Sequence, residues 1–181
     1  MSAPSPQASS ESPAFTLEES HEYCRKLAKR AAKNFYVSFL TLPAEHYRAM
    51  CALYAFMRIC DDIGDDTSVP VEIRRQRLEQ WRCDLLAALD GQPAAHVALP
   101  AVREFVQRFT VPPEYLLAAI DGVAMDLGEV RFATFEELSH YCYHVAGVVG
   151  LCCIEIWGYR HDSARDPALD CGLALHLTKI L

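Results

Sequence analysis

The chain has 181 residues, of which 51% are hydrophobic, so it is long and apolar enough to bury a core, and this composition excludes a wholly disordered protein. Its net charge is −7 at pH 7 and its basic residues are scattered, which argues against a nucleic-acid partner. The eight cysteines fall mostly in apolar helical patterns and form no C-x-x-C pair, so we expect reduced core thiols in a cytosolic protein.

The first fifteen residues lack the basic start and the apolar segment of a signal peptide, and they predict a disordered tail over residues 1–15. From residue 16 onward, apolar residues recur at spacings of three and four, which is typical of amphipathic helices. Clusters of Pro, Gly and Asp separate the helices that we expect near residues 17–35, 44–65, 71–89, 100–109, 114–129, 135–158 and 166–181. The sequence therefore predicts an all-α bundle, with any site built between facing helices.

The longest apolar run, Val145 to Ile154, is too short to cross a bilayer, which takes about 20 residues, and Glu155 interrupts it. We therefore expect no transmembrane segment and a cytoplasmic location. Peripheral contact with a membrane stays compatible with the sequence.

The most unusual stretch is ALYAFMRICDDIGDD, residues 52–66, in which four aspartates end an apolar helix. Asp61 and Asp65 are four residues apart, and Asp62 lies three before Asp65, so several carboxylates share a helix face. Each like-charged pair costs about 0.2–0.5 kcal/mol, and the C-terminal end of a helix is already negative. A solvated acidic helix end is the alternative interpretation, but the added propensity cost of Gly64 favours a functional site.

A bound cation would remove this penalty. One or two carboxylates, with open positions for water and phosphate oxygens, are the usual protein ligands of Mg²⁺, and the segment does not follow a calcium-loop pattern. Arg58 stands one turn before the aspartates, in a position to pair with a phosphate oxygen, and Tyr54 stands on the same face. The local chemistry thus predicts diphosphate binding through magnesium.

A second segment, VAGVVG at residues 145–150, contains two glycines in a helical pattern. Gly147 and Gly150 each cost about 0.8–1.0 kcal/mol relative to alanine in a helix, so we expect a packing reason for them. A close helix neighbour and a flat apolar wall for a ligand both fit such a face.

The stretch AKNFYVSFLTLPAEHYRAMCALYAFMRICDDIGDD combines S-F, LP, ALYAF-x-R and DD-x-x-D, and MDLGEVRFATFEELSHYCYHVAGVVGLCCIEIWGY combines a tyrosine-rich part with VAG-x-VG. In this order, both resemble the squalene and phytoene synthase family, the head-to-head trans-prenyltransferases, and in particular its bacterial squalene-pathway members. The resemblance implies an isoprenoid-synthase-type helical bundle, incomplete at the C-terminus. It also implies that residues 16–181 are the N-terminal part of a single domain.

The resemblance implies that Mg²⁺, with Mn²⁺ as an alternative, holds the diphosphates of two prenyl chains. The residues implied are the metal ligands Asp61, Asp62 and Asp65, the diphosphate contacts Ser38, Phe39 and Arg58, the catalytic tyrosines Tyr54 and Tyr141, a prenyl pocket of Val145, Ala146, Gly147 and Gly150, and an acidic position at Asp126. Without the resemblance, Ser38 and Phe39 would be an ordinary helix end and Tyr54 an ordinary core residue.

The implied reaction is the condensation of two prenyl diphosphates, with release of diphosphate, to presqualene diphosphate and a squalene-type or phytoene-type product. The likeness of AKNFYVSF and VGLCCIEIWG to bacterial squalene-pathway members favours farnesyl over geranylgeranyl diphosphate. No nicotinamide-binding glycine fingerprint is present, so the sequence does not predict whether NADPH takes part.

The chain departs from the family in its last residues, CGLALHLTKIL. His176 stands where glutamine is usual and Lys179 where asparagine is usual, and the sequence stops at Leu181, before the family's second aspartate motif. A lysine repels a cation that an asparagine oxygen would ligate. An active synthase, an inactive fragment and a non-catalytic isoprenoid-binding or assembly protein of the same fold all stay open.

Two E-x-x-H motifs, at residues 18–21 and 137–140, match the di-iron pattern of carboxylate bundles. They overlap T-x-x-E capping boxes that begin at Thr16 and Thr134, and capping is the interpretation that we prefer. A chain-elongating prenyl diphosphate synthase would share the aspartates and the helical architecture, but S-F and VAG-x-VG favour head-to-head condensation.

Overall fold

The computed structural model describes residues 15–32, 34–128 and 131–180, and within these ranges the regular structure is entirely helical, as predicted. The predicted tail lies outside the described residues except for Phe15. The elements in chain order are α1 Leu17–Ala31, α2 Asn34–Phe39, α3 Ala44–Gly64, α4 Val71–Leu89, α5 Leu99–Arg108, α6 Pro113–Met125, α7 Phe135–Cys142, the π-helical turn η1 Tyr143–Gly147, α8 Val148–Trp157, the 3₁₀ turn η2 Asp162–Ala164 and α9 Arg165–Ile180. Among the described helices, none is long and apolar enough to span a bilayer.

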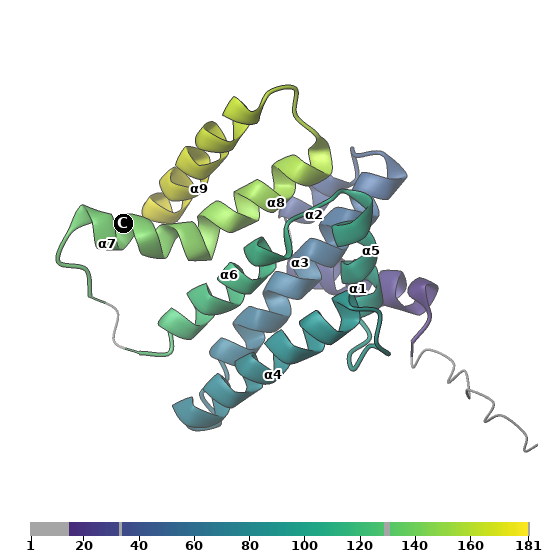
Figure 1. The fold of residues 1–181 in the computed structure, drawn as a ribbon, viewed down its shortest axis with the longest axis horizontal. Helices are drawn as coiled ribbons and strands as arrows, with labels where there is room; N and C mark the ends of the chain where they lie inside the picture. Colours follow the sequence, from purple (N-terminus) through teal and green to yellow (C-terminus); the bar gives the residue numbers. More distant parts are fainter. Residues whose placement is uncertain (1–14, 33, 129–130, 181) are drawn as a thin grey trace, which may run out of the picture.

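Helix α3 is the centre of the molecule. It packs against α1, α2, α4, α5, α6 and α8. Its residues from Ala49 to Phe56 are almost all buried, which is expected for a helix with neighbours on every side. In Figure 1, α3 and α6 run side by side and end at the same side of the molecule, near the point where α4 begins.

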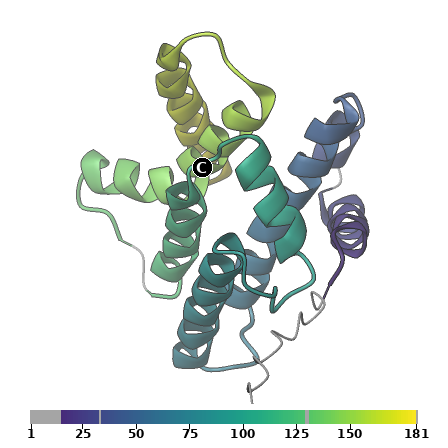
Figure 2. The ribbon, with the colours of Figure 1, turned by 45° about the vertical axis from the view of Figure 1, so that its right-hand side comes forward.

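A second group of helices lies on the far side of α6. The turn η1 contacts α6, α7, α8 and α9, and Figure 2 shows α7 to α9 together on one side of α6, with α1 on the opposite side of the molecule. The polypeptide from Phe135 onward is therefore held to the α3 bundle mainly through α6 and α8.

Two predicted helices are divided in the structure. The helix expected over residues 17–35 ends at Ala31, and α2 then directs Tyr36 and Phe39 toward the core, where the Tyr36 hydroxyl lies 2.8 Å from that of Tyr47. The helix expected over residues 135–158 is interrupted by η1. Both divisions depend on tertiary contacts that a helical period does not show.

The backbone of η1 fits between glycines of its neighbours. A Cβ atom on Gly122 of α6 would lie 2.9 Å from the carbonyl carbon of His144, and one on Gly172 of α9 would lie 3.0 Å from the carbonyl oxygen of Ala146. Real Cβ atoms essentially never come as close to backbone as the contact at Gly122, so a larger residue there would force the helices apart, whereas the contact at Gly172 is tight and would require its neighbour to shift by a few tenths of an ångström.

The predicted glycine face of VAG-x-VG meets α9. A Cβ atom on Gly147 would lie 3.1 Å from Leu169 Cδ2, and one on Gly150 would lie 3.0 Å from the carbonyl oxygen of Ala168. Close helix contact, one of the two expected reasons for these glycines, is therefore confirmed.

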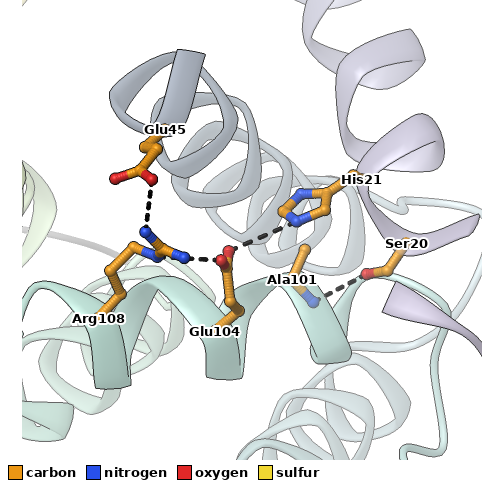
Figure 3. Close-up of polar contacts among 6 residues, drawn as sticks. All are labelled: Ser20, His21, Glu45, Ala101, Glu104 and Arg108. Atoms are coloured by element: carbon orange, nitrogen blue, oxygen red, sulfur yellow. Dashed lines mark hydrogen bonds and ion pairs between the residues drawn. The ribbon is translucent and has the colours of Figure 1, made fainter. Parts of the chain in front are cut away.

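Polar contacts join α1 to α5 (Figure 3), and in Figure 1 these two helices lie on the side of the molecule away from α7. The buried Ser20 hydroxyl accepts a 2.9 Å hydrogen bond from the Ala101 backbone N–H. His21 Nε2 lies 3.4 Å from Oε2 of Glu104, and the other carboxylate oxygen of Glu104, Oε1, pairs with Arg108 Nε at 3.2 Å. Burial lowers the pKa of His21, although Glu104 acts in the opposite direction.

The predicted capping box at Thr16 is complete, whereas at Thr134 only the cap from the threonine is present, because the Glu137 carboxylate accepts from the Ala133 N–H. Thr16 Oγ1 accepts from the Glu19 N–H at 3.2 Å while the Glu19 carboxylate accepts from the Thr16 N–H, and Thr134 Oγ1 accepts from the Glu137 N–H at 3.2 Å. The E-x-x-H motifs lie on α1 and α7, at opposite ends of the molecule in Figures 1 and 2. They do not come together, so the di-iron alternative is wrong for the described part of the chain.

The cysteines are all free thiols, but not all of them belong to the core. The core-thiol prediction is wrong for Cys83 and Cys171, which are exposed on α4 and α9, and only half true of Cys153, which is partly buried. It is confirmed for the buried residues Cys24, Cys51, Cys60, Cys142 and Cys152.

Candidate functional site

A cavity of about 260 Å³ opens where α3 and α6 both end. Its lining comes from the last turn of α3, the loop after it, the first turn of α4 and the end of α6. The lining residues are Asp61, Gly64, Asp65, Thr67, Arg74, Val123 and Asp126.

Asp61 and Asp65 face the same cavity, as their spacing predicted. The Asp65 backbone N–H donates to the Asp61 carbonyl at 2.8 Å, so the helical register continues to Asp65, the C-cap of α3. Asp62 does not line this cavity, and its carboxylate instead pairs with the Arg58 guanidinium at 2.5 Å. The structure therefore brings two of the three aspartates of the motif together.

Asp126 adds a third carboxylate from a different helix. It is the C-cap of α6, as Asp65 is of α3. Neither helix has a basic residue in its last turn, although cations are the usual partners of the negative end of a helix dipole. Two helix ends and three carboxylates thus make the cavity strongly attractive to a cation.

The donor set fits Mg²⁺. No three His, Cys, Asp or Glu side chains of the described residues already converge in a metal-binding geometry. Mg²⁺ is usually bound through one or two carboxylates plus waters and substrate phosphate oxygens, and the fit therefore depends on Asp61 and Asp65 alone. Asp61 and Asp65 are the residues placed to hold it, since they share one turn of helix.

Tyr141 reaches the same place from α7. Its hydroxyl donates a 2.7 Å hydrogen bond to Asp126 Oδ1, and its side chain is 9% exposed. Burial, together with this hydrogen bond, raises the pKa of Tyr141 above the usual tyrosine value. The hydroxyl therefore stays protonated at neutral pH and can hold the Asp126 carboxylate in place.

Tyr141 also lines a larger neighbouring cavity of about 600 Å³. The ring of Phe132 lies 5.0 Å from that of Tyr141, and the ring of His176 lies 5.4 Å away on α9. The unusual His176 thus contacts a predicted catalytic residue, whereas the Lys179 side chain lies outside the described part of the chain. The full lining is Met125, Arg131, Phe132, Thr134, Glu136, Glu137, His140 and Tyr141.

The remaining predicted site residues line neither cavity. Tyr54 is half-buried against the core, and burial raises its pKa. Phe39 is buried in the core, and the exposed Ser38 hydroxyl donates to the Phe35 carbonyl at 2.7 Å. The others are the VAG-x-VG residues Val145, Ala146, Gly147 and Gly150 and the ion-paired Arg58 and Asp62.

Arg74 is the lining residue that the sequence did not single out. It stands in the first turn of α4, ten positions after Gly64, and the loop between the helices carries no recognisable motif. Only the fold places its guanidinium at the end of α3, where it donates to the Gly64 carbonyl at 2.7 Å.

Residues 28–181 match the family model described as squalene/phytoene synthase. A phytoene synthase of Pseudescherichia vulneris is 39% identical over 140 residues, which cover 74% of this chain and 45% of that protein. A presqualene diphosphate synthase of Zymomonas mobilis is 36% identical over 165 residues, which cover 91% of this chain and 56% of that protein.

Solved structures show the same fold. A dehydrosqualene synthase in complex with ligand superposes with a TM-score of 0.81 at 27% identity, over 91% of this chain and 56% of that one. The squalene synthase HpnC from Alicyclobacillus acidocaldarius also superposes with a TM-score of 0.81 at 27% identity, over 90% of this chain and 60% of that one. The chain spans about half the length of the relatives that it matches. Because the family match covers most of the sequence and the fold agrees with it, this chain belongs to the squalene/phytoene synthase family.

Proposed function

We propose that the protein is a magnesium-dependent transferase that condenses two prenyl diphosphates head to head and releases diphosphate. Farnesyl diphosphate is the substrate that we favour, with presqualene diphosphate leading to a squalene-type product, whereas geranylgeranyl diphosphate would lead through prephytoene diphosphate to a phytoene-type product. The observation that carries the proposal is the meeting of Asp61 and Asp65 with the Tyr141–Asp126 pair around one cavity, in a chain of this family.

Mg²⁺, or Mn²⁺ in its place, would neutralise and orient the leaving diphosphate when bound by Asp61 and Asp65. The C–O bond of the first substrate would then break, with its electron pair leaving on the diphosphate, and the double bond of the second chain would attack the allylic cation. The new cation would lose a proton to the released diphosphate as the cyclopropane ring closes. The rings of Tyr141 and Phe132 beside the larger cavity would present π faces that stabilise a cation.

The other sequence predictions belong to the same proposal. Arg58, Ser38 and Phe39 would contact diphosphate, Tyr54 would face the reaction, and the segment 145–150 would line the prenyl chains. Residues 16–181 would form the N-terminal part of a single domain, in a cytoplasmic protein with peripheral contact to the membrane that holds its lipid substrates.

A second candidate function is non-catalytic isoprenoid binding. It is favoured by the replacement of the usual glutamine and asparagine with His176 and Lys179, since the lysine would repel a metal ion. This candidate predicts that the protein binds a prenyl diphosphate without converting it.

Incubation of the purified protein with labelled farnesyl or geranylgeranyl diphosphate and Mg²⁺ separates the two functions. An extractable hydrocarbon or cyclopropyl diphosphate product supports the transferase, while binding without product supports the second candidate. Asp61→Asn should abolish both the formation of product and the metal-dependent binding of the prenyl diphosphate. Asp62→Asn should reduce them less, because Asp62 does not line the cavity. Absence of both binding and product in the wild type contradicts both functions.

A further inference from the structure

Arg74 supplies the basic side chain among the residues that line the aspartate cavity. Arg58, which the sequence suggested as a phosphate contact, is already paired with Asp62 and does not line the cavity. The structure thus places Arg74 of α4 among the residues that line the cavity with Asp61 and Asp65, whereas a contact of Arg58 with the same diphosphate would require its separation from Asp62.

The guanidinium of Arg74 is held in a fixed position. Its Nη1 donates to the carbonyl of Gly64, which belongs to the last turn of α3 and has no partner within its own helix. Arg74 is half-buried, so this hydrogen bond anchors one edge of the guanidinium while its charge remains at the cavity.

A second donor of the same group is unused. Arg74 Nε is buried and makes no hydrogen bond within the described part of the chain. Buried donors nearly always have a partner, and a guanidinium carries five N–H groups arranged to match the oxygens of a carboxylate or phosphate. The guanidinium of Arg74 therefore has hydrogen-bonding capacity that the described residues do not use, and the side chain lines the aspartate cavity.

We propose that Arg74 is a diphosphate-binding residue: its guanidinium donates to oxygens of the diphosphate whose metal ion is held by Asp61 and Asp65. This inference rests on the proposed function and identifies the residue that recognises the charged head of the substrate. The contact involves the diphosphate alone, so inorganic pyrophosphate and a prenyl diphosphate should depend on it equally.

The alternative is that Arg74 only secures the last turn of α3 through the Gly64 carbonyl. The two roles predict opposite effects on metal binding in the absence of diphosphate. Removal of a diphosphate ligand takes a positive charge away from the aspartates and leaves binding of Mn²⁺ alone unchanged or tighter. Loss of a turn-holding residue would displace Asp65 and weaken it.

The experiment compares the full chain with Arg74→Gln, Arg74→Lys and the control Arg75→Gln, whose side chain is exposed on the same turn. Calorimetry measures binding of Mn²⁺ alone, of inorganic pyrophosphate with Mg²⁺ and of farnesyl diphosphate with Mg²⁺, and circular dichroism checks folding. We expect Arg74→Gln to weaken both diphosphate ligands about tenfold to a hundredfold, with Mn²⁺ alone bound at least as well. Arg74→Lys should recover part of the loss because it keeps the charge but not the planar fork.

Unchanged diphosphate affinity in Arg74→Gln overturns the inference and leaves the proposed function standing. Equal weakening of Mn²⁺ alone, or an effect on farnesyl diphosphate but not on pyrophosphate, also overturns it. If the wild type binds neither ligand with Mg²⁺, the proposed function fails and the inference fails with it. Should Arg74→Gln unfold, the same comparison is made with Arg74→Lys, for which about threefold to tenfold weaker diphosphate binding is expected.

Discussion

Replacement of Gly122 by alanine pushes directly on the contact that sets the distance between α6 and η1. Gly122 lies three residues before Met125, the last residue of α6, and Asp126 follows as the C-cap. A Cβ atom there would lie 2.9 Å from the His144 carbonyl carbon and 3.0 Å from its oxygen. Tyr141 stands one helical turn before His144, so a shift of this backbone moves both partners of the Tyr141–Asp126 hydrogen bond.

The size of the effect follows from two opposing terms. Overpacking a buried contact costs about 1–3 kcal/mol, and the upper part of this range applies because the neighbour is backbone and cannot rotate away. Alanine in place of glycine in a helix returns about 1 kcal/mol. Gly122→Ala should therefore lower the free energy of unfolding by about 1–2 kcal/mol and Tm by about 2–8 °C.

Gly128→Ala is the matched control, since a Cβ atom at Gly128 would meet nothing within 4 Å. Its stability should equal that of the wild type or exceed it by about 0.4–1 kcal/mol, through reduced freedom of the unfolded chain. Urea unfolding followed by circular dichroism measures both variants.

Ultraviolet absorbance difference adds a local probe of the site, because burial and the bond to Asp126 raise the pKa of Tyr141. Gly122→Ala should bring this pKa back toward the ordinary tyrosine value. The reasoning is refuted if Gly122→Ala is as stable as Gly128→Ala and the tyrosine titration is unchanged. The backbone of η1 would then move to accommodate the added methyl group, and the glycine contact would not set the spacing of the site.

Three further predictions concern other parts of the molecule. Ser20→Ala leaves the Ala101 N–H buried without an acceptor and should lower the free energy of unfolding, measured in urea, by about 1–3 kcal/mol. A decrease smaller than about 0.5 kcal/mol would contradict this hydrogen bond. Above about pH 10 the unfolded chain ionises its tyrosines before the folded one ionises Tyr141, so wild-type stability should fall more steeply with pH than that of Tyr141→Phe, and equal slopes would refute the raised pKa. In the native protein a disulfide reagent should modify Cys83 and Cys171 quickly and the other thiols slowly, so a fast phase that persists when both are changed to serine would disprove their assigned exposure.

The helices were largely predictable because each carries its own signals. The range 71–89, predicted from periodicity between two loop clusters, matches α4 at both ends, since Pro70 and Asp90 flank a helical pattern. The π-helical turn was not predicted from the helical period of residues 135–158, and its backbone packs against Gly122 and Gly172 of other helices, a contact that this period does not show. The hydrophobic period of a segment describes that helix alone and does not show how neighbouring helices pack against it.

In the candidate site, too, residues related by helical spacing were predictable from the sequence, whereas contacts between separate helices were not. Asp61 and Asp65 were predictable because residues four apart share a face, and both line the cavity. Asp62 follows Asp61 by one residue, a rotation of about 100°, which turns it toward Arg58 instead. The hydrogen bond between Tyr141 and Asp126 and the approach of Arg74 join separate helices, and a resemblance or a structure was needed to find them.

The arrangement of charges explains why this end of the bundle is better suited to binding than to stability. Three carboxylates and the negative C-terminal ends of two helices surround one cavity. Without a cation, these negative charges repel one another. Arg74 offsets only part of this negative charge. Because its guanidinium is anchored by the Gly64 carbonyl and not by a carboxylate, the aspartates stay available to a metal ion. A ligand that carries both a metal ion and a diphosphate satisfies the aspartates and the arginine together, whereas either component alone leaves one of the two charges uncompensated.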